Sequence, residues 1–241
     1  MSCHRENLLV GPLCTRRGPT RAKSGSTPTS PDTMTDTRFT DAAATWNTRF
    51  QGADYLFGTQ PNVYLQSHAD HLPASGTALC VADGEGRNSV WLARRGLQVD
   101  AFDISEVGVA KARQLAHQAG VQVNYTVADC DRWPWPQDHY DLVAAIFIQF
   151  ADPAMRTRLF ANIVRTLKPG GLLILQGYTP KQLEYKTGGP PILSHLYTEA
   201  LLREAFAELD LIELRLYEDD LAEGQHHLGR SALAGLVARK P

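Results

Sequence analysis

The sequence predicts a doubly wound α/β fold, in which a mostly parallel, seven-stranded sheet ends in a C-terminal antiparallel hairpin. From residue 78 onward, short apolar runs alternate with amphipathic stretches of helical period. The run at residues 140–150 is almost wholly apolar, as expected of a strand in a parallel sheet covered on both faces. The last two runs, at residues 211–219 and 231–240, have no helical pattern between them and can pair with each other.

The expected elements follow from this alternation and from residues typical of helix ends. Strands are expected at residues 78–82, 97–103, 121–129, 140–150, 172–178, 211–219 and 231–240, and helices at residues 87–96, 105–120, 153–167 and 198–209. Ser105 is a preferred N-cap residue, Gly120 is a typical C-terminal stop, and Pro153 is favoured in the first helical turn. We expect residues 168–171 to form a turn and the polar residues 220–230 to form the hairpin loop.

Length and composition indicate one globular domain with a short extension. The chain has 241 residues, of which 43% are hydrophobic and 21% charged. No apolar run is long enough to cross a bilayer, and the net charge of −2 argues against a nucleic-acid partner. The four cysteines show no ligand-like spacing, so we expect no metal site and a reducing, cytoplasmic location. A monomer or weak homodimer without membrane contact is expected.

The first 33 residues differ in composition from the rest of the chain. They are rich in Ser, Thr, Pro, Gly and Arg and lack a hydrophobic period, so they cannot bury enough apolar surface to offset the entropy of ordering. We interpret residues 1–33 as a disordered extension or, if translation begins at Met34, as an untranslated one. An organelle transit peptide is the alternative. Residues 34–241 are then a single domain.

A glycine turn after the first strand is the main functional signal. Gly84 and Gly86 fall where a strand gives way to a helix, and in open α/β sheets this turn usually belongs to the ligand site. Asp103 closes the next strand, 19 residues after Gly84. An acidic side chain at about this spacing accepts hydrogen bonds from ribose hydroxyls, so the pair indicates a ligand of the adenosine type.

Two ligands compete for such a site, a nicotinamide dinucleotide and S-adenosylmethionine. The dinucleotide fingerprint requires a third glycine, and here Ser89 takes its place. A dehydrogenase is therefore supported only by the general, Rossmann-like fold.

The sequence resembles the class I S-adenosylmethionine-dependent methyltransferases. The resemblance is carried by "LCVADGEGRNSVWLARRG", "VDAFDIS", "VADCDRWPWP", "YDLV" and "LKPGGLLIL", and it extends over about residues 46–240. More narrowly, the chain is similar to the small bacterial enzymes related to tellurite-resistance and thiopurine methyltransferases. This resemblance implies S-adenosyl-L-methionine as cofactor and a small-molecule methyl acceptor.

The resemblance also implies roles for individual residues. Gly84 and Gly86 match the loop against the methionine part of the cofactor, Asp103 matches the acid that holds the ribose hydroxyls, and Ile104 matches the residue that packs on the adenine. Asp129 and Cys130 match the border of the adenine edge, and Ile146 begins the segment that faces the methyl donor. One departure is that Cys80 stands where the family has an acid. Asp83 is then the residue expected to supply that carboxylate.

No catalytic triad is visible, and methyl transfer does not require one. The protein has to align the acceptor, the methyl group and the leaving sulfur for an in-line displacement, and a general base is needed only for a protonated acceptor of high pKa. The substrate-side candidates are Gln149, Tyr178, His226 and His227, with Trp46, Tyr55, Phe57 and Tyr185 as further aromatic wall residues. A histidine in a hairpin loop is more often solvated, so the two histidines have that alternative.

The function expected from these observations is methyl transfer to a small nucleophile such as a thiol or a chalcogen oxyanion. The alternative is a non-catalytic S-adenosylmethionine-binding regulatory module, which the altered loop around Cys80 and Asp83 favours.

Overall fold

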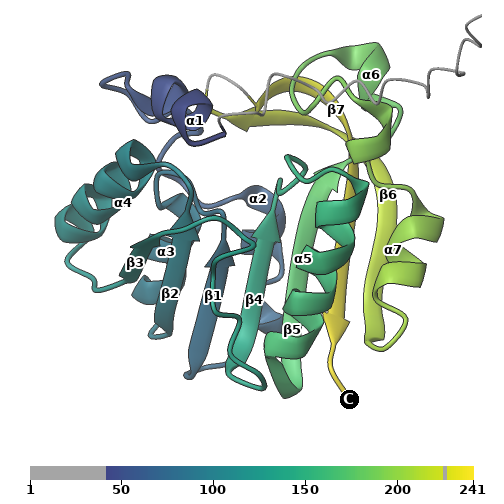
Figure 1. Ribbon diagram of the computed structural model, residues 1–241, viewed down its shortest axis with the longest axis horizontal. Coiled ribbons are helices and arrows are strands. Elements are labelled where there is room, and N and C mark those ends of the chain that lie inside the picture. Colours follow the sequence, from purple (N-terminus) through teal and green to yellow (C-terminus); the bar gives the residue numbers. More distant parts are fainter. Residues whose placement is uncertain (1–41, 225–226) are drawn as a thin grey trace, which may run out of the picture. The chain divides into compact units, whose positions relative to one another are not determined.

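The sheet has seven strands, and its order confirms the predicted architecture. A computed structural model describes residues 42–224 and 227–241, all within one compact unit. The strands lie in the order β3-β2-β1-β4-β5-β7-β6, as Figure 1 shows. Their bounds are β1 Thr77–Val81, β2 Gln98–Asp103, β3 Asn124–Val127, β4 Tyr140–Ile146, β5 Leu167–Tyr178, β6 Asp210–Glu223 and β7 His227–Arg239. The first five strands are parallel, and β7 pairs antiparallel with both β5 and β6.

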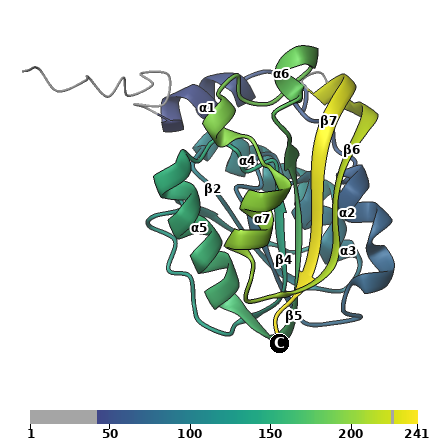
Figure 2. The same cartoon turned by 90° about the vertical axis from the view of Figure 1, so that its right-hand side faces the viewer.

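Helices cover both faces of this sheet (Figure 2). The helical elements are α1 Ala42–Phe50, α2 Val63–Ser67, η2 Ala69–His71, α3 Arg87–Arg94, α4 Glu106–Ala119, α5 Pro153–Thr166, α6 Gln182–Tyr185, η3 Leu193–His195 and α7 Glu199–Ala205. Helices α5 and α7 pack on one face, while α2 and α3 pack on the other and α4 packs beside α3. Strands β1 to β3 are added toward one edge of the sheet, and β4 and β5 are added toward the other edge. The carboxyl ends of β1 and β4 therefore form the switch point where α/β proteins bind ligands.

The predicted helix ends are confirmed at two helices. The Ser105 side chain accepts a hydrogen bond from the Gly108 N–H and caps α4, and Gly120 ends that helix in the left-handed region. Pro153 opens α5 after the Asp152 carboxylate, which accepts a hydrogen bond from the Met155 N–H.

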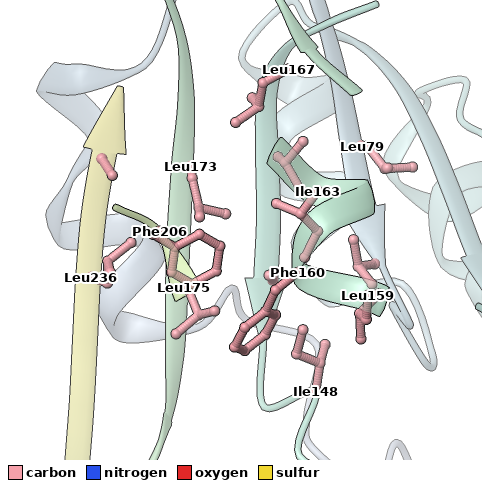
Figure 3. Close-up of a cluster of buried hydrophobic side chains, with 14 of the residues drawn as sticks. Leu79, Ile148, Leu159, Phe160, Ile163, Leu167, Leu173, Leu175, Phe206 and Leu236 are labelled. Atoms are coloured by element: carbon pink, nitrogen blue, oxygen red, sulfur yellow. The ribbon is translucent and has the colours of Figure 1, made fainter. Parts of the chain in front are cut away.

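The larger core cluster fills the space between the sheet and α5. Figure 3 shows Leu159, Phe160 and Ile163 of α5 in one cluster with Leu173 of β5 and Leu236 of β7. All five side chains are almost fully buried. This packing fixes β4 and β5 side by side, so their carboxyl ends are rigid supports for a site.

Three predicted boundaries were wrong. Residues 168–171 form a bulged start of β5 rather than a turn, because Gly170 donates its N–H to the Lys240 carbonyl. Strand β4 ends at Ile146, where the chain turns through Phe147 with φ of 56°. The hairpin strands run on to Glu223 and His227, so most of the predicted loop 220–230 is paired strand.

Some expectations lie outside the described residues. These concern residues 1–33 and His226. In the part of the chain that the structure describes, no helix combines the length and the apolar character that a membrane crossing requires.

Candidate active site

The predicted glycine bend forms at the carboxyl end of β1. Ala82, Gly84 and Gly86 all have positive φ values, of 48°, 61° and 92°. A Cβ atom at Gly86 would lie 2.8 Å from the Ala112 Cβ and 2.9 Å from the Tyr125 hydroxyl. Glycine is therefore required here by both the backbone conformation and the close packing of α3 on α4.

Asp103 is in direct contact with this bend. The Gly84 N–H donates to its Oδ2 at 2.8 Å, and the Ser105 N–H donates to its Oδ1 at 2.9 Å. Asp103 is only 6% exposed, and burial raises its carboxyl pKa to about 6 although these N–H groups oppose the shift. The 19-residue spacing thus brings a carboxylate and the main chain of the glycine bend together, as the sequence predicts.

Asp83 faces a different set of groups, below the bend. The Ser89 hydroxyl donates a short hydrogen bond to its Oδ2, and the same hydroxyl lies 2.8 Å from the Tyr125 hydroxyl. Burial raises the pKa of Asp83 to about 7. Burial and then this neighbouring carboxyl raise the pKa of the Cys80 thiol well above its ordinary value. The carboxyl group of Asp83 therefore lies beside Cys80, the residue that stands where the family resemblance leads us to expect an acid.

The remaining cofactor-side candidates lie at the ends of β2, β3 and β4. Ile104 is partly exposed directly after Asp103, and Asp129 accepts a hydrogen bond of 2.9 Å from the Arg132 N–H. Cys130 is buried, and its carbonyl accepts the Trp135 Nε1–H at 2.7 Å. Ile146, the last residue of β4, is also buried. Their contact with a cofactor stays a prediction.

Phe50, at the end of α1, covers the bend. It was not identified from the sequence as a residue of the candidate site. Its ring lies 3.3 Å from the position of a Cβ at Gly84 and 3.0 Å from that of a Cβ at Gly108. Phe50 is 2% exposed, so both glycines provide the space for it. No local pattern singles out this residue, because α1 is short and its other apolar residues are three alanines and Trp46.

The linker between α1 and α2 is fastened to α3 and α4. Lys111 of α4 forms a close ion pair with Glu85 and donates to the carbonyls of Phe50, Gly52 and Asp54. The other Glu85 oxygen accepts the Leu56 N–H at 2.6 Å. Residues 50–56 are thereby held next to the glycine bend.

Four aromatic rings from distant segments meet beyond this linker. We call Phe57, Phe147, Tyr178 and His227 the four-ring cluster. His227 contacts the other three, with ring centroids 4.5 Å from Phe57, 4.2 Å from Phe147 and 5.8 Å from Tyr178, and Phe147 lies 4.8 Å from Tyr178. The Phe50 and Phe57 rings are 6.4 Å apart, so aromatic contacts lead from the bend to the cluster.

A buried ion pair adjoins the cluster. Arg87 at the start of α3 pairs with Glu223 at the end of β6 at 2.8 Å, and both side chains are less than a tenth exposed. Glu223 also accepts hydrogen bonds from the Asn62 side chain and the Val63 N–H. The Arg87 guanidinium lies 5.9 Å from the Phe57 ring and donates to the Phe57 carbonyl at 3.3 Å. These contacts fix the hairpin tip to α3 and α2.

The substrate-side candidates differ in their surroundings. The Gln149 amide donates to the carbonyls of Tyr178 and His195 and accepts the Tyr178 N–H, so it joins the ends of β4 and β5. Tyr178 is 1% exposed. His227 is buried rather than solvated, because β7 begins at this residue and places it among the rings.

The other aromatic candidates lie farther out. Trp46 stacks on Phe50, Tyr55 donates its hydroxyl to the Lys111 carbonyl, and Tyr185 donates its hydroxyl to Glu218. A role of these residues toward a substrate stays a prediction.

Comparisons with known proteins agree with this fold. Residues 78–171 match a family model described as a methyltransferase domain. The ubiquinone/menaquinone biosynthesis C-methyltransferase UbiE of Shewanella piezotolerans is 32% identical over 87 residues, which are 35% of this chain and 34% of that protein. The matched region thus spans about a third of the length of this curated relative.

Solved structures extend the similarity to most of the chain. The N-methyltransferase NodS from Bradyrhizobium japonicum in complex with S-adenosyl-l-homocysteine aligns with a TM-score of 0.62 at 13% identity, covering 83% of this chain and 98% of NodS. TehB from Haemophilus influenzae aligns with a TM-score of 0.60 at 17% identity, covering 74% of this chain and 61% of TehB. Residues 78–171 are therefore similar to a methyltransferase domain, and the chain shares its fold with the solved methyltransferase NodS.

Proposed function

We propose that the protein is an S-adenosylmethionine-dependent methyltransferase that acts on a small-molecule nucleophile. The observation that carries this proposal is the contact between Gly84 and Asp103 at the switch point of the sheet. The methyltransferase domain match covers both residues. The narrower relation to tellurite-resistance and thiopurine methyltransferases remains part of the proposal, supported by the similarity to TehB.

The residues around the bend fit a sulfur-bearing nucleoside. The Asp103 carboxylate accepts backbone N–H groups, among them those of Gly84 and Ser105, and a carboxylate has about four lone-pair sites, which leaves capacity for a ribose hydroxyl. Gly84 has a positive φ and carries no side chain, and the Phe50 ring lies against it. Ile104 supplies a partly exposed apolar surface next to Asp103 for a flat base. Asp129 and Cys130 would border the edge of that base.

The chain's contribution to methyl transfer is alignment and exclusion of water. When bound, S-adenosylmethionine supplies a methyl group on a positively charged sulfur that an in-line nucleophile can displace. The strand ends at Ile146 and Tyr178 are held together through Gln149, so groups placed on them keep a fixed geometry. Positioning of this kind contributes up to about 7–11 kcal/mol to lowering a barrier. Phe50 and the linker above the bend would exclude water from the site.

A small acceptor is supported by the charge and the covering of this end of the sheet. The chain carries a net charge of −2, which does not favour a polyanion. The linker, the hairpin tip and α6 all lie over the carboxyl ends of the strands (Figure 1). A bulky polymer would have to displace them.

Methyl transfer can be tested directly with S-adenosylmethionine labelled in the methyl group. We expect labelled product with at least one of an aliphatic thiol, an aromatic alcohol, an aromatic amine, selenite or tellurite. Asp103→Ala should lower the rate at subsaturating cofactor, whereas Asp131→Ala, which removes an exposed carboxylate paired with Arg158, should not. Cofactor binding without any product or S-adenosylhomocysteine would instead support the non-catalytic regulatory module.

A further inference from the structure

Tyr178 carries a buried hydroxyl that lacks a hydrogen-bond partner. The residue is 1% exposed, and no described residue satisfies its OH. Burial of an unsatisfied polar group lowers stability, so each such group needs a physical explanation. Burial, followed by the nearby Glu223 charge, raises the pKa of Tyr178. The hydroxyl therefore stays protonated and can donate.

The Tyr178 ring is held in place by its neighbours. Gly189, with φ of 79°, packs so closely that a Cβ there would lie 2.6 Å from the ring. Phe147 covers another side at a centroid distance of 4.8 Å. The Tyr178 N–H is bonded to Gln149, and its carbonyl accepts the Tyr197 N–H. The hydroxyl thus has a defined position at the carboxyl end of β5.

Phe147 provides a second indication at the same place. It directly follows β4 and adopts φ of 56°, a conformation that is strained for a bulky residue. Its N–H donates to the Gln176 carbonyl of β5 at 2.8 Å. Strained residues of this kind concentrate at ligand sites, and this one lies beside the unsatisfied hydroxyl.

The four-ring cluster has an outer and an inner half. Phe57 and Phe147 are partly exposed, whereas Tyr178 and His227 are buried. A molecule approaching from solvent would meet the first two rings before the Tyr178 hydroxyl. Flat apolar groups pack well between such rings.

The charges around the cluster disfavour an anion. Arg87, the cation that faces Phe57, is already paired with Glu223 and with the Phe57 carbonyl. Glu223 is buried and lies close enough to Tyr178 to influence its ionisation. An oxyanion entering here would meet a carboxylate and a cation whose charge is compensated.

From these observations we infer that the four-ring cluster is the acceptor subsite and that the Tyr178 hydroxyl is its hydrogen-bonding group. This subsite would select an uncharged acceptor with a flat apolar body and one polar nucleophilic atom, in preference to an inorganic oxyanion. This inference rests on the proposed methyltransferase function and narrows its substrate class.

The test measures binding of two probes, 2-naphthol and selenite, to the full chain saturated with S-adenosylhomocysteine. We expect calorimetry to show binding of 2-naphthol and none of selenite. Tyr178→Phe should weaken 2-naphthol binding about three- to tenfold, the effect of one lost neutral hydrogen bond, without changing the affinity for S-adenosylhomocysteine.

Tyr197→Phe is the matched control. Tyr197 is also 1% exposed with an unpartnered hydroxyl, but it packs in the core cluster with Phe160 rather than in the four-ring cluster. Both substitutions should raise the melting temperature of the ligand-free protein, by about 2–4 °C, because each removes an unsatisfied buried group. Only Tyr178→Phe should weaken the binding of 2-naphthol.

Three results would overturn the inference while leaving the proposed function intact: no binding of 2-naphthol, equal affinity of wild type and Tyr178→Phe, or binding of selenite at the same site. Failure of S-adenosylhomocysteine to bind at all would instead overturn the proposed function, and the inference with it.

Discussion

Asp83 and Asp103 carry two carboxyl groups next to the Gly84 bend, and these groups are held in different ways. Asp103 accepts backbone N–H groups from Gly84 and Ser105, whereas Asp83 accepts the Ser89 hydroxyl. The contact of Asp103 with the bend could be anticipated, because the spacing of a strand–turn–helix–strand unit is fixed. The partners of Asp83 could not, since they depend on side-chain directions on α3 and β3 that a sequence pattern does not specify.

The raised pKa of Asp83, about 7, predicts how stability depends on pH. The folded protein binds the proton more tightly than the unfolded chain, whose Asp pKa is near 3.8. The free energy of unfolding should therefore increase as the pH falls from 8 to 5, and this contribution is lost as the pH rises through 7. In Asp83→Asn the free energy of unfolding should change less between pH 5 and 8 than it does in wild type. Urea unfolding at several pH values measures this difference.

Asp131→Asn is the control for this measurement. The Asp131 carboxylate is exposed, and its hydrogen bond with Arg158 lowers its pKa, so it is ionised in both folded and unfolded states throughout this pH range. Its replacement should leave this change in the free energy of unfolding as it is in wild type. A change equal to that of wild type in Asp83→Asn would show that Asp83 is not a buried titrating group.

At the scale of elements, the hairpin tip and the α1–α2 linker form one packed unit above the sheet. Gly224, with φ of 71°, lies so close to the linker that a Cβ would be 2.5 Å from the Leu56 carbonyl oxygen and the Phe57 backbone. The buried pair of Arg87 and Glu223 fastens the same tip to α3. The sequence indicated a hairpin but not its length, because the segment 220–230 is mostly polar and resembles a loop.

Gly224→Ala should destabilise the protein more than Gly120→Ala. Both glycines have positive φ, of 71° and 68°, and the backbone strain of alanine in that conformation is about 1–2 kcal/mol at either position. Nothing lies within 4 Å of a Cβ at Gly120, so only Gly224→Ala adds steric overlap, which costs about 1–3 kcal/mol more. Urea unfolding of the two variants measures the difference. Equal losses would mean that the tip and the linker are not packed together.

At the scale of the whole molecule, the periodicity of apolar residues predicted the sheet. The spacing of Gly84 and Asp103 predicted that these two residues lie together in the candidate site. Alternating apolar runs fix strands β1 to β5, and Gly84 with Asp103 follow from their places at strand ends. The four-ring cluster was not predictable as a unit, because its members come from the linker, the residue after β4, β5 and β7, and no local pattern connects them. Such contacts depend on how the segments close over the sheet.

The central claim is that the Gly84 bend and Asp103 together hold S-adenosylmethionine. Calorimetric titration of this ligand into wild type, Asp103→Ala and the exposed control Asp131→Ala tests it most directly. Loss of a hydrogen bond to a charged group costs about 1.5–3 kcal/mol, so Asp103→Ala should bind about ten- to a hundredfold more weakly, with Asp131→Ala unchanged. No binding to wild type, or equal dissociation constants for wild type and Asp103→Ala, would contradict the account.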